Sequence, residues 1–250
     1  MARAVLSCVF VHGWGMNHAV WEPLFELLPS WIEPIALDLP GHGLQAQRGF
    51  SSLQDLVDDL DRRIEQPAMW IGWSLGGLPV LQLARQQAHK VKALWLVTSS
   101  PCFVARDDWP AGMRAEVFDS FAAELERDVT TTVKRFLGLQ VKGSESGRRL
   151  LKTLRQHIEQ MPSANPQALR AGLDLLKQTD LRNALASIRQ PTHWVLGERD
   201  SLVNKRLVES LAELMPESSV ELVAGAAHAP FLSHQEQFAW QLIAFAEHIK

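Results

Sequence analysis

One short segment of this sequence combines a lone hydroxyl group with a high density of glycine. Residues 70–77 read Trp-Ile-Gly-Trp-Ser-Leu-Gly-Gly, which places Ser74 in a Gly-x-Ser-x-Gly pattern between a strand-like run and a helix-like run. In that context the pattern predicts a tight turn that projects the serine as a nucleophile, while the glycines let strand and helix cross closely. The pattern is weak on its own, because a helix that simply starts with Ser74 as its N-cap has the same residues.

A serine hydroxyl is a poor nucleophile near neutral pH, so it needs a base and a carboxylate that orients the base. His228 is the preferred base, because it follows the last strand-like run in the small-residue segment Gly-Ala-Ala-His-Ala-Pro; His234 is a local competitor. Asp200 is the preferred carboxylate, because it follows the strand-like run 192–196. Its rivals are Glu198, Asp107 and Asp108.

Acyl transfer also requires hydrogen-bond donors for the oxyanion of the transition state. The N–H of Leu75 directly follows the nucleophile, and the turn Gly-Trp-Gly at 13–15 can expose the N–H of Trp14. His12 is expected to support that turn rather than to react. Together these segments, each at the end of a predicted strand, indicate serine-dependent acyl transfer, most simply ester hydrolysis.

The elements that would position these residues alternate between strand and helix. Short β-branched and aromatic runs predict strands at 5–11, 32–37, 68–71, 91–98, 192–196 and 219–223. Helical patterns include 53–64, 75–87, 202–215 and 236–248. This alternation predicts an α/β fold with a mostly parallel central sheet flanked by helices, in which ligands bind at the carboxyl ends of the strands.

The strand signal stops between 106 and 185, where helix-forming sequence takes over. We therefore expect a helical cap, residues 106–185, inserted between two strands of a core formed by residues 1–105 and 186–250.

Part of the expected cap is basic. Residues 134–155 contain seven Lys or Arg and one acidic residue. Arg148, Lys152 and Arg155 share one helix face, and Arg135 lies one segment earlier. Such a face is usually solvated, and the alternative is a docking surface for an acidic macromolecule. The apolar residues among these charges would line an acyl channel or form the cap's own core; they are Phe136, Leu137, Leu139, Leu150, Leu151 and Leu154.

Composition excludes several classes of partner. The 250 residues carry a formal net charge of -3, so no global field attracts nucleic acid or an anionic membrane. No apolar run approaches the roughly 20 residues of a membrane span. Cys8 and Cys102 lack metal-ligand or redox spacing and favour a reducing cytoplasm. We expect a cytoplasmic monomer without metal or cofactor.

These segments resemble the α/β-hydrolase family over nearly the whole chain, including its order of serine, acid and histidine. The combination of Gly-Trp-Ser-Leu-Gly-Gly with Ser-Ser-Pro-Cys-Phe at 99–103 and Val-Lys-Arg-Phe-Leu at 133–137 is narrower, and is similar to the biotin-pathway esterases of that family. The resemblance implies a cytoplasmic enzyme that hydrolyses pimeloyl-[acyl-carrier protein] methyl ester and releases methanol.

The resemblance also implies roles for individual residues. Ser74, Asp200 and His228 would form the triad, with the Trp14 and Leu75 amides as oxyanion donors. Arg135, Arg148 and Lys152 match basic positions that hold the acidic carrier protein. Thr131 replaces an expected arginine, and Lys152 stands where arginine is usual, which keeps the charge but loses the planar, bidentate fork.

Two other functions fit the same residues. One is a general carboxylesterase or thioesterase that acts on free small molecules, for which the basic face has no role. The other is a binding protein with a hydrolase fold that keeps the triad but turns over negligibly. A burst assay with a chromogenic ester separates a catalyst from a binding protein.

Overall fold

A single parallel sheet forms the centre of the molecule. The computed structural model describes residues 4–144 and 147–249, and its six strands lie in the order β2-β1-β3-β4-β5-β6. The strands are β1 (Leu6–Val11), β2 (Ile32–Leu37), β3 (Ala68–Trp73), β4 (Val91–Val97), β5 (Thr192–Gly197) and β6 (Ser219–Val223). The central strands are buried on both faces, which is why they read as continuous apolar runs.

The register of the sheet brings several strand ends to one edge. Gly72 on β3 pairs with Val11 on β1 and with Leu96 on β4, and Val97 in turn pairs with Val195 on β5. The residues that follow these four strands therefore emerge side by side. The predicted triad and oxyanion residues all come from these ends or from the loop after β6, whereas Phe136, Arg135, Arg148 and Lys152 lie on helices between β4 and β5.

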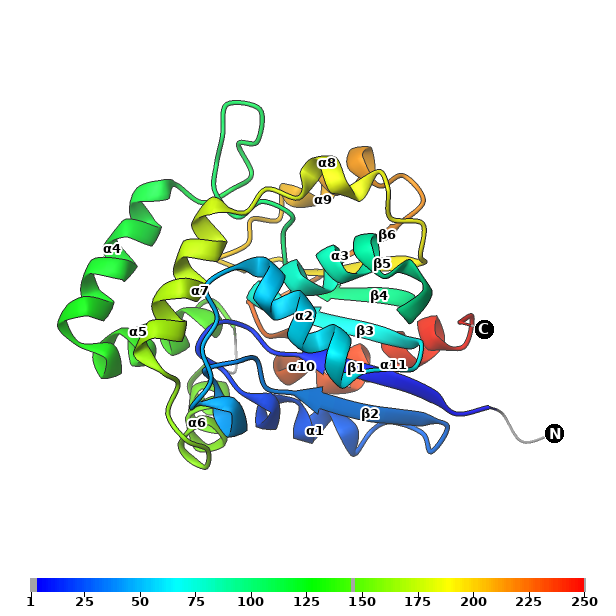
Figure 1. The fold of residues 1–250 in the computed structure, drawn as a ribbon, viewed down its shortest axis with the longest axis horizontal. Helices are drawn as coiled ribbons and strands as arrows, with labels where there is room; N and C mark the ends of the chain where they lie inside the picture. The colour runs from blue at the N-terminus through cyan, green and yellow to red at the C-terminus, as the bar shows by residue number, and fades with distance from the viewer. Residues whose placement is uncertain (1–3, 145–146, 250) are drawn as a thin grey trace.

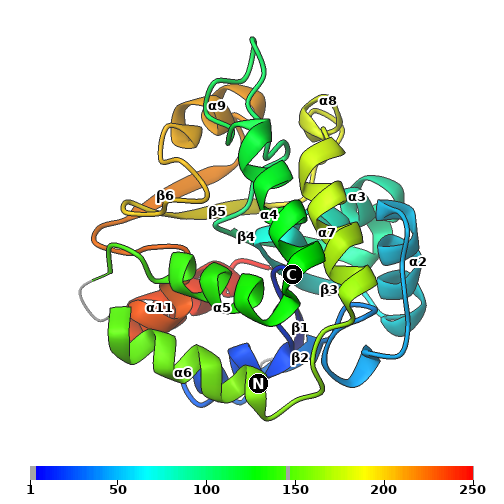
Figure 2. The same cartoon turned by 90° about the vertical axis from the view of Figure 1, so that its left-hand side faces the viewer.

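Helices cover both faces of the sheet. Figure 2 shows α2 (Leu53–Arg63) and α3 (Gly77–Gln86) on one face and α11 (Gln235–Ala246) on the other. On the α11 side, aromatic rings pack in a continuous layer, with Trp95 of β4 contacting Phe238 and Phe245 at centroid distances of 5.8 and 5.3 Å. The short helices α1 (Glu22–Phe25) and α10 (Pro230–Ser233) join this layer through Phe25 and Phe231.

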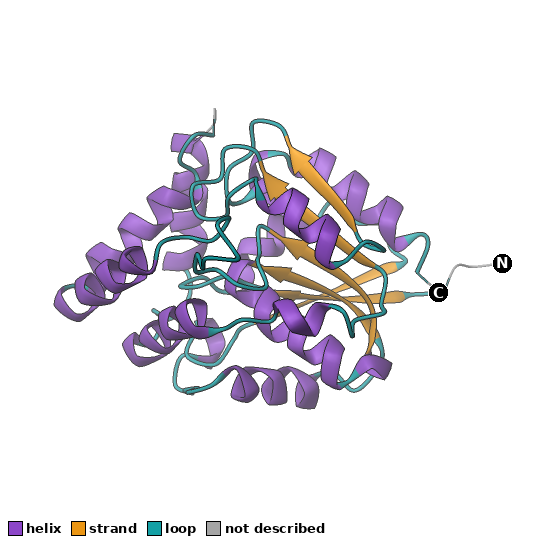
Figure 3. Ribbon diagram, turned by 90° about the horizontal axis from the view of Figure 1, so that it is seen from above, coloured by secondary structure: helices purple, strands orange, loops and turns teal. Residues whose placement is uncertain are grey.

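A group of helices between β4 and β5 covers the carboxyl ends of the strands. They are α4 (Ala115–Arg127), α5 (Val129–Gln140), α6 (Gly147–Glu159) and α7 (Pro166–Gln178), followed by the short α8 (Arg182–Leu185). Figures 1 and 3 show the strand arrows pointing toward these helices. We call α4–α7 the cap. The remaining α-helix of the described residues, α9 (Leu207–Leu214), lies between β5 and β6 in the chain.

The predicted α/β architecture is confirmed, and the differences lie at element ends. The helix expected at 202–215 begins only at Leu207, because the Asp200 carboxylate accepts the N–H groups of Leu202 and Val203 and holds a turn there. The helix expected from 75 begins at Gly77, after a 3-10 turn from Ser74 to Gly76.

The start of the expected cap is also irregular rather than helical. Residues 106–114 form a loop in which Val104 bridges to Met113 and the Trp109 indole donates to the Cys102 carbonyl at 2.8 Å. Within residues 4–144 and 147–249, no helix has the length and apolar character needed to cross a bilayer.

Candidate active site

Ser74 occupies a strained turn between β3 and α3. Its φ of 52° lies in the left-handed region, which residues with a side chain adopt rarely and only where the surrounding packing imposes it. A Cβ on Gly76 would lie 2.6 Å from the carbonyl oxygens of Val11 and His12. A Cβ on Gly72 would lie 2.7 Å from the Cα of Gly77, the first residue of α3. The turn therefore fits against the end of β1 only because Gly76 lacks a side chain, and the start of α3 lies against β3 only because Gly72 lacks one.

His228 and Asp200 form a buried pair at the same edge. Nδ1 of His228 lies 2.7 Å from Oδ2 of Asp200, and the two side chains are 1% and 0% exposed. The other Asp200 oxygen accepts two backbone N–H groups, from Leu202 at 2.7 Å and Val203 at 3.1 Å, so the carboxylate is held from both sides. An ionised carboxylate only accepts hydrogen bonds, so the imidazole proton lies on Nδ1 and Nε2 is left as an acceptor.

Ser74 and His228 line one small cavity of about 30 Å³. His228 Nε2 is buried and has no hydrogen-bond partner among the described residues. The remaining walls are apolar and come from both core and cap: Phe103, Met113, Phe118, Phe121, Phe136, Leu173, Leu176 and Leu202. Such a cavity holds about one or two water molecules. An acyl chain can therefore bind only if cap side chains move.

The rival acids and the rival base lie elsewhere. The Glu198 carboxylate accepts the N–H of Gly225 at 2.9 Å, so it braces the loop that carries His228 without reaching the imidazole. Asp108 is exposed and pairs with Arg182, and Asp107 is also exposed. His234 contacts the neighbouring Ser233 hydroxyl. Among these candidates, only Asp200 pairs with His228.

The turn after β1 lies directly against the nucleophile. A Cβ on Gly13 would be 3.2 Å from the Cβ of Ser74. The Trp14 and Leu75 amides donate no hydrogen bond to other described residues, as the role of oxyanion donor requires. The Trp14 indole donates to the Leu169 carbonyl of α7 at 2.7 Å, and its ring meets Phe136 of α5 edge-on at 4.7 Å.

His12 supports this turn from below. Its Nδ1 donates to the Gly13 carbonyl at 2.8 Å, and its Nε2 accepts the Leu39 N–H at 3.0 Å. These two bonds require the neutral imidazole. Complete burial, with His42 adding to the effect, lowers the pKa of His12 to about 3. His12 is therefore neutral at physiological pH.

Comparison with known proteins decides the family. A family model described as alpha/beta hydrolase family matches residues 8–241. The chain belongs to the α/β-hydrolase family. Among curated relatives of this α/β-hydrolase, the pimeloyl-[acyl-carrier protein] methyl ester esterase of Klebsiella pneumoniae is 41% identical over 236 residues, covering 94% of this chain and 91% of that protein. The protein of the same name from Yersinia pseudotuberculosis is 39% identical over 242 residues, covering 97% and 93%.

Solved α/β-hydrolases show the same fold at lower identity. An esterase from Exiguobacterium antarcticum has a TM-score of 0.87 at 21% identity, covering 98% of this chain and 93% of that chain. A bromoperoxidase from Bacillus anthracis has a TM-score of 0.89 at 20% identity, covering 98% and 92%. At this identity the likeness concerns the fold alone.

The basic residues of this α/β-hydrolase's cap differ in their surroundings. Arg148 and Lys152 on α6 are exposed. Arg135 on α5 is half exposed, but it forms an ion pair with Glu124 of α4 and lies 5.1 Å above the Phe121 ring. It therefore also holds two cap helices together. Asp128 is the N-cap of α5, and its carboxylate accepts the Thr131 N–H at 2.9 Å and the Thr131 hydroxyl at 2.6 Å.

Sequence reasoning missed the residues that hold His228 in place. The Trp73 indole and the Thr98 hydroxyl both donate to the His228 carbonyl, each at 2.8 Å. The Ser99 hydroxyl donates to the Ser74 carbonyl, also at 2.8 Å. The available signal was position, since Thr98 and Ser99 directly follow β4 at the edge where Ser74 lies.

Proposed function

We propose that this α/β-hydrolase is a serine carboxylesterase that hydrolyses the methyl ester of pimeloyl-[acyl-carrier protein], releasing methanol. The observation that carries the chemistry is the buried His228–Asp200 hydrogen bond, with unpaired Nε2 beside Ser74 in one cavity. The substrate is inferred from the curated relatives, whose name specifies it and whose sequences match nearly the whole chain.

In the first half-reaction His228 Nε2 takes the proton of Ser74 as Oγ attacks the ester carbonyl carbon. The imidazolium is stabilised by Asp200, and the negative charge on the former carbonyl oxygen is received by the Trp14 and Leu75 amides. The C–O bond to the methoxy group then breaks, the leaving oxygen takes the proton from Nε2, and methanol departs. An acyl group remains on Ser74.

In the second half-reaction water replaces methanol. His228 takes a proton from water as its oxygen attacks the acyl carbon, and the same two amides receive the oxyanion. The bond to Ser74 Oγ breaks, Oγ recovers the proton from Nε2, and the carboxylic acid is released and loses its remaining proton to water. The apolar walls of the cavity, Phe136 among them, suit the methylene chain of the acyl group.

The carrier protein is the proposed partner, docked against Arg148 and Lys152 with a contribution from Arg135. We propose that the enzyme acts in the cytoplasm as a monomer; the two free cysteines, both buried, agree with a reducing compartment.

The direct test is incubation of the purified protein with methyl pimeloyl-carrier protein. Hydrolysis adds one negative charge to the carrier's acyl group, so the product migrates faster on a native gel, and methanol appears in equal amount. Ser74→Ala protein is the control and leaves the band unshifted. If wild-type protein cleaves free methyl esters but leaves the carrier-linked ester intact, it is a general carboxylesterase.

A further inference from the structure

We propose that Thr98 and Trp73 are positioning residues that hold the backbone of His228, and so aim its Nε2 at Ser74. This proposal rests on the proposed function, because it concerns the base of that reaction. Neither residue touches the cavity, and both act through the same carbonyl oxygen.

The His228 carbonyl is fully occupied by donors from two strand ends. Trp73 ends β3 and donates its indole N–H, while Thr98 follows β4 and donates its hydroxyl, each at 2.8 Å. A carbonyl oxygen has two lone pairs, so these two bonds saturate it. All three residues are fully or almost fully buried, where an unmatched polar group is costly.

The other backbone group of His228 is held by the cap. Its N–H donates to the Gln140 carbonyl, the last residue of α5, at 3.0 Å. The histidine backbone is therefore fixed from opposite sides, by the sheet edge and by a cap helix. With Nδ1 bound to Asp200, the only free polar atom of the residue is Nε2.

Thr98 has a feature that packing alone does not explain. Its φ is 40°, and a β-branched residue in the left-handed region is a genuine outlier. Glycine or asparagine would adopt this backbone at lower cost. The threonine is favoured there by its hydroxyl, which reaches the histidine carbonyl from this conformation. Strain of this kind persists at sites where geometry serves a reaction.

The test compares methyl and p-nitrophenyl esters of the same short-chain acid. Both esters need His228 to activate Ser74, but methoxide must also be protonated as it leaves, whereas p-nitrophenolate leaves without a proton. Thr98→Val keeps the branched shape and removes the donor. We expect kcat/KM for the methyl ester to fall about five- to tenfold, with a clearly smaller loss for the p-nitrophenyl ester and KM unchanged.

Four further variants make the test specific, and one of them is Trp73→Phe alone. Thr98→Ser restores the hydroxyl and should recover both rates. Thr192→Val is the matched control, because it also removes a hydrogen bond that a buried threonine donates to a carbonyl, here that of Gln190 at 2.9 Å. It should leave both rates unchanged. In the double variant Thr98→Val with Trp73→Phe the carbonyl loses both donors, and the loss should exceed the product of the single losses.

We call the two hydrogen bonds from Thr98 and Trp73 to the His228 carbonyl the clamp. The outcomes of the test distinguish a failure of the clamp from a failure of the proposed esterase function. If the wild type hydrolyses both esters and Thr98→Val does so at the same rates, the clamp is wrong and the proposed function stands. The clamp is also wrong if Thr98→Val lowers kcat/KM for both esters by the same factor, because partial unfolding of the protein has that effect. If the wild type hydrolyses neither ester and also leaves methyl pimeloyl-carrier protein intact, the proposed function is wrong and the clamp falls with it.

Discussion

At the residue scale, the absence of side chains at Gly72 and Gly76 decides whether Ser74 can take its place. Both glycines lie where a Cβ would overlap backbone atoms rather than flexible side chains, so no rotamer change relieves the contact. The strained φ of Ser74 is maintained by this close packing, of Gly76 against the end of β1 and of Gly72 against Gly77. Small changes here are expected to act on catalysis more than on the fold.

Gly76→Ala should therefore disable the enzyme. The new Cβ would lie 2.6 Å from two carbonyl oxygens and push the turn away from β1. We expect kcat/KM for a chromogenic ester to fall about 100-fold or more, and stability to fall by about 2–4 kcal/mol. The matched control is Gly138→Ala on α5, where a Cβ meets nothing within 4 Å. That change should raise stability by about 0.5–1 kcal/mol and leave activity unchanged.

Asp200→Asn tests the carboxylate. The amide oxygen can still accept the Leu202 and Val203 N–H groups, so the turn survives, but the charge that stabilises the imidazolium is lost. We expect kcat to fall about 10³- to 10⁴-fold with little change in melting temperature. Glu198→Gln, which keeps the acceptor for Gly225, should retain activity within a factor of about 3. Comparable losses in the two variants would contradict the assignment of Asp200.

Sequence reasoning at this scale reached the residues that lie at strand ends. Ser74, Asp200 and His228 each follow a recognisable apolar run, so their common edge could be inferred from a parallel sheet. The clamp on His228 could not, because it depends on where the side chains of Trp73 and Thr98 point after three strands have come together. The ion pair of Arg135 with Glu124 depends in the same way on how α4 and α5 pack.

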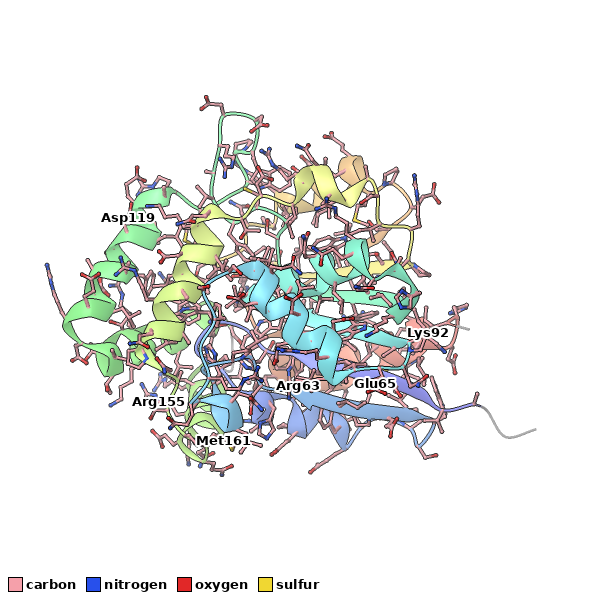
Figure 4. All side chains as sticks on the ribbon, viewed as in Figure 1. Arg63, Glu65, Lys92, Asp119, Arg155 and Met161 are labelled. Atoms are coloured by element: carbon pink, nitrogen blue, oxygen red, sulfur yellow. The ribbon has the colours of Figure 1, made fainter. Side chains whose placement is uncertain are left out.

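At the scale of elements, the cap connects two tasks. Helices α4, α5 and α7 close the cavity with apolar side chains, while α6 carries exposed basic residues outside it. Figure 4 shows Arg155 of α6 at the cap end of the molecule and Lys92 of β4 at the opposite end. The starts of α4 and α9 were harder to predict, because the turns before them, at 106–114 and 198–206, are set by side-chain hydrogen bonds to the backbone.

Charge reversal on α6 should separate carrier docking from chemistry. Arg148→Glu with Lys152→Glu is expected to raise KM for the carrier-linked ester about tenfold or more, and to leave kcat/KM for a free methyl ester unchanged. Arg135 is spared because it also holds α4 to α5. Lys92→Glu gives the same change of charge sign far from the cap and should leave both substrates unaffected. Equal losses on both substrates in the α6 variant would indicate a damaged cap.

At the scale of the whole molecule, buried histidines govern how stability responds to acid. Burial lowers the pKa of His193 to about 4, and that of His12 to about 3. At a pH below 6.5, the ordinary pKa of histidine, these two side chains bind protons in the unfolded chain but stay neutral in the folded chain. Stability must therefore fall as the pH falls from about 6.5 toward 4, by about 1.4 kcal/mol per pH unit for each such histidine.

His193→Phe tests this dependence. Phenylalanine keeps a ring against Trp95, which His193 stacks on at 4.2 Å, and cannot titrate. The free energy of unfolding is measured by denaturant titration between pH 6 and pH 4.5. It should fall less steeply with pH than in the wild type, with a slope smaller by up to about 1.4 kcal/mol per pH unit, the value for one proton. Carboxylates remote from residue 193 contribute equally to both proteins; Glu221, with an oxygen 3.7 Å from Nε2 of His193, is replaced by Gln in both. Identical slopes would mean that His193 is charged in the folded state.

The proposed mechanism depends on Ser74 Oγ being the nucleophile that carries the acyl group of the intermediate. The most direct measurement is intact-mass and peptide analysis of the protein quenched during turnover of a slowly deacylating ester. The prediction is one acyl group per molecule, on Ser74, absent in Ser74→Ala and formed at a much lower rate in His228→Ala. An acyl group on another residue, or a Ser74→Ala protein that hydrolyses the ester at the wild-type rate, would contradict it.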